Sequence, residues 1–186
     1  MCGRYALYSK NKVFSKFNIS IKKNYNISPG NKVLIIDQNM KPIEMIWGIK
    51  PEWKNDFIII NARNETINEK QIFRDSKRCF FIADGYYEWS GKKGNKNPYY
   101  LWLKGQIIYF AGLYNHSGCC IVTEKASNEI SFIHRRQPVF LSYEEIDPWL
   151  RSERVVSTQK KINYHQVSRD VNKTSNNNSN LILSIN

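Results

Sequence analysis

The feature that most constrains the fold is a series of short apolar runs rich in β-branched and aromatic residues. They are separated by turn-forming stretches such as Ser28–Gly30 and Asn115–Gly118. Short runs divided by Gly, Pro and Asn are typical of antiparallel strands. We expect strands at Val33–Asp37, Ile43–Ile49, Phe57–Ile60, Cys79–Ala83, Tyr99–Leu103, Ile107–Tyr114, Cys119–Thr123, Arg154–Ser157 and Tyr164–Ser168, with a last edge strand at Leu181–Ile185.

Three short helices accompany these strands. Residues 10–18 place apolar side chains on one helical face, and residues 64–74 read as a second helix. A capping box, Ser142–Glu145, opens a third helix that runs to about Leu150. The polar stretch 172–180 is expected to be flexible. Because repeats and an internal linker are both missing from the sequence, we predict one α+β domain over residues 1–186 with mostly antiparallel strands.

The charge balance suggests an anionic partner. The 186 residues carry 28 Lys and Arg against 16 Asp and Glu, a net charge of +12, and 13% of them are aromatic. Interleaved cations and rings suit single-stranded nucleic acid first and an acidic membrane surface second. Abundant Lys also fits an AT-rich genome. The sequence contains neither an apolar run long enough to span a membrane nor a secretory signal, so we expect a cytoplasmic or nucleoid location, or a nuclear one in a eukaryote, and no secretion.

Cys2 is unusual because of its position. Removal of Met1 would leave a chain that begins with an α-amine and a thiol on one residue, and both groups can act as nucleophiles near neutral pH. Such an aminothiol condenses with an aldehyde to an imine, which its thiol closes to a thiazolidine. It could also serve as an N-terminal nucleophile in hydrolysis. The alternative is a small residue in a buried terminal strand, and position alone favours that alternative.

Other residues with reactive side chains give weaker signals. Cys79, Cys119 and Cys120 lack metal-ligand spacing, so we expect neither a metal site nor a cofactor. His134 is followed by two arginines, which disfavours its protonated form and suits a proton shuttle, although a surface loop fits equally well. Glu88 is an acid among aromatic residues after an apolar strand. Asn61 and Arg63 follow another apolar run, at a predicted strand-to-helix junction.

Taken in order, several stretches resemble the SRAP (SOS-response-associated peptidase) family. The resemblance extends from Cys2 to about Asn172. The matching stretches are Met1–Tyr5, Tyr25–Gly30, Trp47–Pro51, Ile60–Thr66, Phe81–Trp89, Asn97–Tyr100, Ile121–Thr123, Phe132–Val139 and His165–Ser168. The resemblance implies curved, barrel-like sheets with flanking helices, a groove for single-stranded DNA, and shielding of abasic sites in the DNA damage (SOS) response. The opened abasic sugar is an aldehyde, the partner that an N-terminal aminothiol requires.

The resemblance also implies roles for individual residues. Cys2 would be the nucleophile through its amine and thiol, and Asn61 would hydrogen-bond the opened sugar or that amine. Glu88 would deprotonate the α-ammonium, and His134 would act as acid and base on the sugar oxygen. The implied DNA-binding residues are Arg4, Asn26, Pro29, Trp53, Arg63, Thr123 and Arg136. Departures from the family pattern, such as Glu52 before Trp53 and Gln137 after Arg136, affect the groove more than the chemistry.

Three functions compete at this stage. The first is an enzyme-like monomer that forms a covalent crosslink to abasic sites in single-stranded DNA. The second is a thiol peptidase that acts on itself or other peptides, and the third is a non-covalent single-strand binder. The crosslinker is favoured because Cys2, Asn61, Glu88 and His134 occur together.

Overall fold

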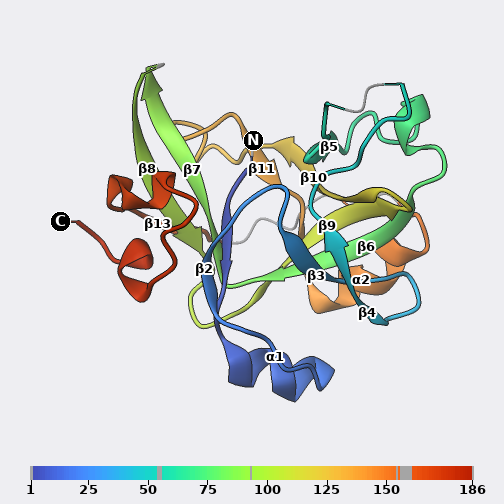
Figure 1. Ribbon diagram of the computed structural model, residues 1–186, viewed down its shortest axis with the longest axis horizontal. Helices are drawn as coiled ribbons and strands as arrows, with labels where there is room; N and C mark the ends of the chain where they lie inside the picture. Colours follow the sequence, from blue (N-terminus) through green and yellow to red (C-terminus); the bar gives the residue numbers. More distant parts are fainter. Residues whose placement is uncertain (1, 54–55, 93, 154, 156–160, 186) are drawn as a thin grey trace.

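Two curved sheets form the body of the protein. The computed structural model describes residues 2–53, 56–92, 94–153, 155 and 161–185. Within these residues most strands pair antiparallel, and two α-helices flank the sheets (Figure 1). The predicted α+β class and mostly antiparallel pairing are therefore confirmed. Along the described strands both sheets stay open at their ends, so the barrel-like expectation is met by curvature and not by closure.

The first sheet contains five antiparallel strands. Their order is β13 (Asn163–Gln166), β8 (Asn95–Trp102), β7 (Gly85–Lys92), β1 (Tyr5–Leu7) and β2 (Asn24–Ile27). β7 and β8 form a long hairpin, the green arm that rises from the body in Figure 1. This sheet places the N-terminal strand β1 directly beside β7, with Tyr5 opposite Tyr86.

The second sheet contains eight strands, ordered β11 (Arg136–Pro138), β10 (Gly118–Lys125), β9 (Ile108–Asn115), β6 (Lys77–Ala83), β3 (Lys32–Ile36) and β4 (Pro42–Ile46). Off this path, β12 (Phe140–Leu141) pairs with β9, and β5 (Asn61–Arg63) pairs parallel to β10. The turn into β10 requires glycine. Gly118 has φ +155°, and a Cβ there would lie 2.3 Å from the carbonyl oxygen of Gly48.

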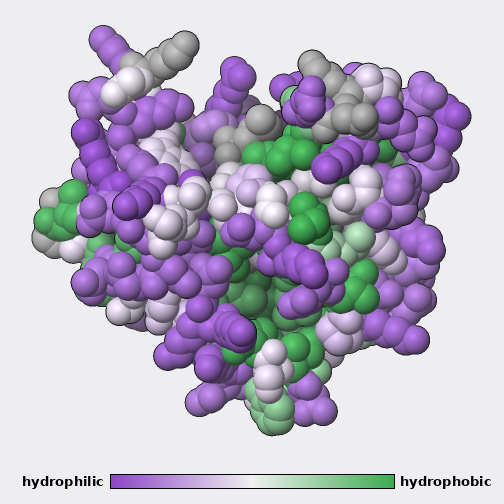
Figure 2. All heavy atoms as spheres, viewed as in Figure 1, coloured by the Kyte–Doolittle hydropathy of each residue, from purple (hydrophilic) through white to green (hydrophobic). Residues whose placement is uncertain are grey.

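The core lies between the two sheets. Aromatic rings meet edge to face across it, with Tyr5 against Phe81 and Phe110, and Tyr86 against Phe110. β6 is buried from Arg78 to Ala83, because both of its faces are covered. Its continuous apolar run is the expected pattern for such a strand. On the face drawn in Figure 2, hydrophilic residues cover the outer arms and hydrophobic residues gather over the middle, above α1.

The helices and the C-terminal segment cover the outside. α1 (Lys10–Phe17) follows β1, and α2 (Tyr143–Leu150) begins at the predicted capping box, in which Ser142 Oγ accepts from the Glu145 amide. Residues 167–185 include two 3-10 turns, Arg169–Asn172 and Ser179–Ile182, and pack on the outer face of the five-stranded sheet. Among the described helices none is long and apolar enough to cross a membrane.

Several predicted elements differ from the structure. The helix predicted at 64–74 is wrong: the segment consists of turns and a 3-10 turn at Gln71–Phe73, because Asn64 bonds to the carbonyl oxygen of Val155 and Glu65 pairs with Arg136 on β11. Phe57–Ile60 contributes only a bridge from Ile59 to Ile49, and the strand begins at Asn61. The expected edge strand at 181–185 is replaced by a 3-10 turn. The strand predicted at 154–157 lies outside the described residues, apart from Val155.

Candidate functional site

Cys2 lies in the core, three residues before β1 begins at Tyr5. Its side chain is fully buried, and Sγ is 3.9 Å from the carbonyl oxygen of Arg4. Burial, and then the negative charge of Glu88, raise the pKa of the Cys2 thiol far above its usual range. In the chain with Met1 attached, the thiol is therefore protonated at neutral pH.

Asn61 contacts Cys2 from the other sheet. It is the first residue of β5, whose register on β10 sets Asn61 beside Ile121. Asn61 Nδ2 donates a hydrogen bond of 2.9 Å to the carbonyl oxygen of Cys2. Asn61 Oδ1 is buried and accepts no hydrogen bond from the described part of the chain. A buried acceptor without a partner is costly, so this oxygen is suited to a donor group on a bound ligand.

Glu88 provides a buried carboxyl group near Cys2. It lies on β7 and is 4% exposed. Burial raises the pKa of Glu88, and nearby positive charge, including that of His134, partly offsets this effect. A carboxylate with a raised pKa is a better proton acceptor than an exposed one.

His134 completes the group from the loop before β11. The ring is half-buried, and the Arg136 amide donates a hydrogen bond of 3.0 Å to His134 Nδ1. Nδ1 also lies 3.1 Å from the carbonyl oxygen of Arg136, so the tautomer of the ring decides whether Nδ1 accepts from the amide or donates to the carbonyl. The structure therefore brings Cys2, Asn61, Glu88 and His134 together from four separate segments.

Two tyrosines that the sequence analysis did not single out belong to the same site. Tyr5 and Tyr86 are buried, and their hydroxyl groups make no hydrogen bond with the described residues. Burial raises the pKa of both hydroxyl groups, with smaller contributions from Cys119 and Cys2 at Tyr5 and from Glu88 and Cys2 at Tyr86. They lie within the stretches Met1–Tyr5 and Phe81–Trp89, but aromatic residues in strands usually belong to the core and gave no separate signal.

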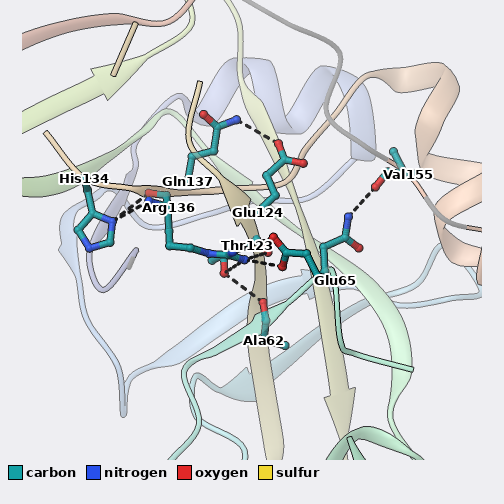
Figure 3. Close-up of polar contacts among 9 residues, drawn as sticks. Ala62, Glu65, Thr123, Glu124, His134, Arg136, Gln137 and Val155 are labelled. Carbon is teal, nitrogen blue, oxygen red and sulfur yellow. Dashed lines mark hydrogen bonds and ion pairs between the residues drawn. The ribbon is translucent and has the colours of Figure 1, made fainter. Parts of the chain in front are cut away.

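Arg136 ties three segments of the eight-stranded sheet together (Figure 3). Its guanidinium donates to both carboxylate oxygens of Glu65, at 2.7 and 2.9 Å, and to the carbonyl oxygen of Thr123 at 2.5 Å. Thr123 Oγ1, fully buried, donates to the carbonyl oxygen of Ala62. The network joins β11, β10 and the turn after β5, so it connects the strand that carries Asn61 to the segment that carries His134. Sequence reasoning did not assign Glu65 a role.

Arg4 and Asn26 form a second network, on the five-stranded sheet. Arg4 Nη1 donates to Asn26 Oδ1 and to the carbonyl oxygen of Val171, both at 2.7 Å. Asn26 Nδ2 lies within hydrogen-bond distance of the carbonyl oxygens of Val171, Lys173 and Asn176. Asn26 is 2% exposed, so these contacts anchor the C-terminal segment. The flexibility of residues 172–180 stays a prediction, although the carbonyl oxygens of Lys173 and Asn176 in that stretch accept hydrogen bonds from Asn26.

The other predicted DNA-binding residues lie at the surface. Trp53 is 71% exposed, Arg63 is exposed at the end of β5, and Pro29 is half-buried in the turn after β2. The structure therefore leaves Trp53 and Arg63 open to a ligand, whereas Arg4, Asn26, Thr123 and Arg136 are engaged in internal contacts.

The described residues contain no group of three or more His, Cys, Asp or Glu side chains placed to hold a metal ion. Cys79, Cys119 and Cys120 are buried free thiols, and burial raises the pKa of each.

Comparison with known proteins shows several relatives. The abasic site processing protein YoaM of Bacillus subtilis is 35% identical over 179 residues, which cover 81% of this chain and 79% of that protein. YedK of Escherichia coli, also an abasic site processing protein, is 32% identical over 144 residues, covering 69% of this chain and 65% of YedK. HMCES of Gallus gallus, of the same description, is 27% identical over 186 residues, covering 72% of this chain and 54% of HMCES.

Solved structures show the same fold. A protein from Bacteroides thetaiotaomicron superposes with a TM-score of 0.81 at 22% identity and covers 98% of this chain and 99% of its own. A phage-related protein from Bordetella bronchiseptica gives 0.73 at 26% identity, covering 90% of this chain and 95% of its own. The family model for "SOS response associated peptidase (SRAP)" matches residues 1–174. The chain belongs to the SRAP family.

Proposed function

We propose that this protein processes abasic sites in single-stranded DNA by forming a covalent crosslink through Cys2. The observation that carries the proposal is the cluster of Cys2, Asn61, Glu88 and His134, with the hydrogen bond from Asn61 to the backbone of Cys2. The relatives support it, since YoaM, YedK and HMCES are each named abasic site processing proteins.

The reaction begins with removal of Met1, because an amide nitrogen cannot form an imine. The freed α-amine of Cys2 attacks the aldehyde carbon of the opened sugar and gives a carbinolamine. Loss of one water forms the C=N bond. The thiol then adds to that carbon, forming a C–S bond, and its proton passes to the nitrogen. The product is a thiazolidine, and the net loss is one water.

Each neighbouring residue has a role in this scheme. Glu88 takes the proton of the α-ammonium, which its raised pKa favours. His134 donates a proton to the sugar oxygen during ring opening and to the departing hydroxyl group during imine formation. Asn61 Oδ1, which accepts no hydrogen bond from the described residues, accepts one from the α-amine of Cys2 or from a sugar hydroxyl group.

DNA contacts would come from the basic and aromatic residues around the site. Arg63 and Trp53 are exposed, so Arg63 can meet a phosphate and Trp53 can stack on a base. For Arg4 and Arg136 to bind phosphate, each would have to share donors with its present partners. We further propose that residues 1–186 act as one monomeric domain in the cytoplasm or nucleoid.

The thiol peptidase is less well supported than the crosslinker. A peptidase of this kind attacks with a thiolate, whereas burial raises the pKa of the Cys2 thiol. In the crosslinking scheme the amine attacks first, and the thiol reacts only with an imine already formed beside it.

Intact-protein mass spectrometry tests the proposal. The protein is measured before and after mixing with a single-stranded oligonucleotide that carries one abasic site. We expect loss of Met1 and a mass gain equal to the oligonucleotide less one water. Cys2→Ala and Cys2→Ser both keep the α-amine and lack the thiol, so neither should form a stable thiazolidine, and the imine of each should be trapped only by borohydride reduction.

A matched pair of asparagine variants tests the site. Asn61→Ala should slow adduct formation, whereas Asn11→Ala, an exposed residue of α1, should not. A processed protein with Cys2 at its terminus that forms no adduct would refute the crosslinking function.

A further inference from the structure

An exposed aromatic cluster lies outside the group of reacting residues. It consists of Tyr99 on β8, Phe132 in the loop before β11, and Tyr164 on β13. The ring centroids of Phe132 lie 6.1 Å from Tyr99 and 5.4 Å from Tyr164, and those of Tyr99 and Tyr164 are 6.4 Å apart. Phe132 is 54% and Tyr164 is 42% exposed. Two large rings of a packed cluster are thus held at the surface.

The strand register sets this cluster on the same face of the five-stranded sheet as Glu88. Tyr99 is the direct partner of Glu88 in the β7–β8 ladder, and directly opposed side chains share a face. Phe132 lies two residues before His134, and Ser90 Oγ on β7 donates a hydrogen bond of 3.0 Å to its carbonyl oxygen. The cluster therefore extends outward from the candidate site.

Two arginines accompany the rings. Arg135 is exposed between His134 and Arg136. Arg169 is exposed and donates to Asn95 Oδ1 at 2.6 Å and Asn97 Oδ1 at 2.9 Å. Side chains alternate along a strand, so Asn97 and Tyr99 share a face of β8. Arg135 therefore lies in the loop that carries Phe132, and Arg169 contacts β8 two residues from Tyr99.

We propose that the aromatic cluster, with Arg135 and Arg169, is a stacking subsite for one or two bases of single-stranded DNA beside the abasic site. The inference rests on the proposed function, because it assigns a flank of the same substrate. Rings with charged neighbours match a single strand, whose bases stack while its phosphates meet cations. Aromatic residues and arginine are enriched at protein–protein interfaces too, so the test includes a second copy of the chain as one of its outcomes.

The test separates stacking from simple apolar packing. Phe132→Leu and Tyr164→Leu keep apolar bulk but remove the planar face, and Phe132→Trp restores a ring. Tyr143→Leu, an exposed tyrosine at the start of α2, is the matched control. Affinity is measured by fluorescence anisotropy for a single-stranded oligonucleotide with an unreactive tetrahydrofuran abasic analogue. Thermal unfolding of each variant checks that it is folded.

We expect Phe132→Leu to weaken binding about fivefold or more, the lower end of the range for losing one stacked base. Phe132→Trp should bind as the wild type does, and Tyr143→Leu should have no effect. Trimming the oligonucleotide on one side of the analogue should abolish the difference between Phe132→Leu and wild type, while trimming the other side should preserve it. That asymmetry would identify which flank reaches the cluster.

Other outcomes would overturn the subsite. Equal binding by wild type, Phe132→Leu and Tyr164→Leu would refute it. Phe132→Ala provides a second check: if it weakens DNA binding, and Leu at position 132 restores the affinity while Trp does not, the cluster acts by apolar packing and the stacking subsite is refuted. A concentration-dependent dimer that only the leucine variants lose would assign the cluster to a second copy of the chain. Because the analogue cannot react, this binding result is independent of whether the wild type crosslinks to a true abasic site.

Discussion

The ion pair between Glu65 and Arg136 offers a sharp test of how the site is held. Glu65 accepts two hydrogen bonds from the Arg136 guanidinium, and the pair joins the turn after β5 to β11. Glu65→Gln removes the negative charge and replaces one acceptor oxygen by an NH₂ group that faces a donor. One of the two bonds is lost, and the Arg136 side chain, 15% exposed, is left without a counter-charge.

The magnitude follows from the exposure of the pair. A hydrogen bond to a charged group contributes about 1.5–3 kcal/mol when well shielded. The Glu65 side chain is 44% exposed, so solvent screening reduces this contribution. We expect Glu65→Gln to lower the free energy of unfolding by about 1–2 kcal/mol at neutral pH, which for a domain of this size lowers Tm by roughly 2–8 °C.

The pH dependence has a definite sign. The hydrogen bonds from Arg136 lower the pKa of Glu65, against a smaller opposing effect of burial. Since the folded pKa lies below the unfolded one, the stabilisation is present above the unfolded pKa, about 4.3 for a free Glu side chain. It is lost as the pH falls through the folded pKa. The difference between wild type and Glu65→Gln should therefore be largest at neutral pH and shrink below about pH 4.

Urea and thermal unfolding at neutral and acidic pH measure both effects. Glu69→Gln, an exposed glutamate in the same loop, is the control and should change stability by less than about 0.5 kcal/mol. If Glu65→Gln unfolds together with Glu69→Gln at neutral pH, or if the gap to wild type persists in acid, the pair does not hold β5 against β11. In that case Glu65→Gln, Glu69→Gln and the wild type should also crosslink to abasic DNA at equal rates.

Three further predictions concern other parts of the molecule. Asn26→Ala should destabilise the fold by about 2–4 kcal/mol, because three carbonyl oxygens and Arg4 lose a buried partner. Urea unfolding checks this with Asn11→Ala as the control, and equal unfolding midpoints for the two variants would contradict it. The crosslinking rate should fall as the pH drops through the raised pKa of Glu88, and gel assays stopped at fixed times should find no such fall in Glu88→Gln. A fall in rate at low pH that persists in Glu88→Gln would assign the titration to another group. Gly118→Ala should cost about 2 kcal/mol or more, since its Cβ would meet the Gly48 carbonyl, whereas Gly105→Ala meets open space and should cost only the strain of its φ of +71°, about 1 kcal/mol. Thermal unfolding that ranks the two equally would refute the close approach.

Local patterns predicted much of the fold. The apolar runs at Val33–Asp37 and Ile107–Tyr114 correspond closely to β3 and β9, because their β-branched and aromatic residues were bounded by turn residues. The capping box at Ser142 located α2 to the residue, since its two hydrogen bonds are made within four residues of chain. The helix predicted at 64–74 is wrong because Asn64 and Glu65 bond to Val155 and Arg136, contacts that no local pattern reveals.

The candidate site depended on both levels. Position and residue type singled out Cys2, and the resemblance in stretches spread from Met1 to Ser168 identified Asn61, Glu88 and His134 as its companions. Their roles stay predictions, as do those of the DNA-binding residues. Three features became visible only in three dimensions. They are the burial of the Cys2 thiol, the Asn61 Oδ1 that accepts no hydrogen bond from the described residues, and the buried hydroxyl groups of Tyr5 and Tyr86.

The sequence by itself determined the α+β class, the antiparallel character of the strands, and the family, because periodicity, turn residues and ordered stretches are local properties of the chain. Only the tertiary structure decided that β5 pairs with β10, that Arg136 bonds Glu65, and that Asn26 holds the C-terminal segment. These contacts join residues 60 to 150 positions apart, and burial and charge around the site follow from such contacts. A pKa or an exposed ring is set by what packs against it, and packing is decided by the whole fold.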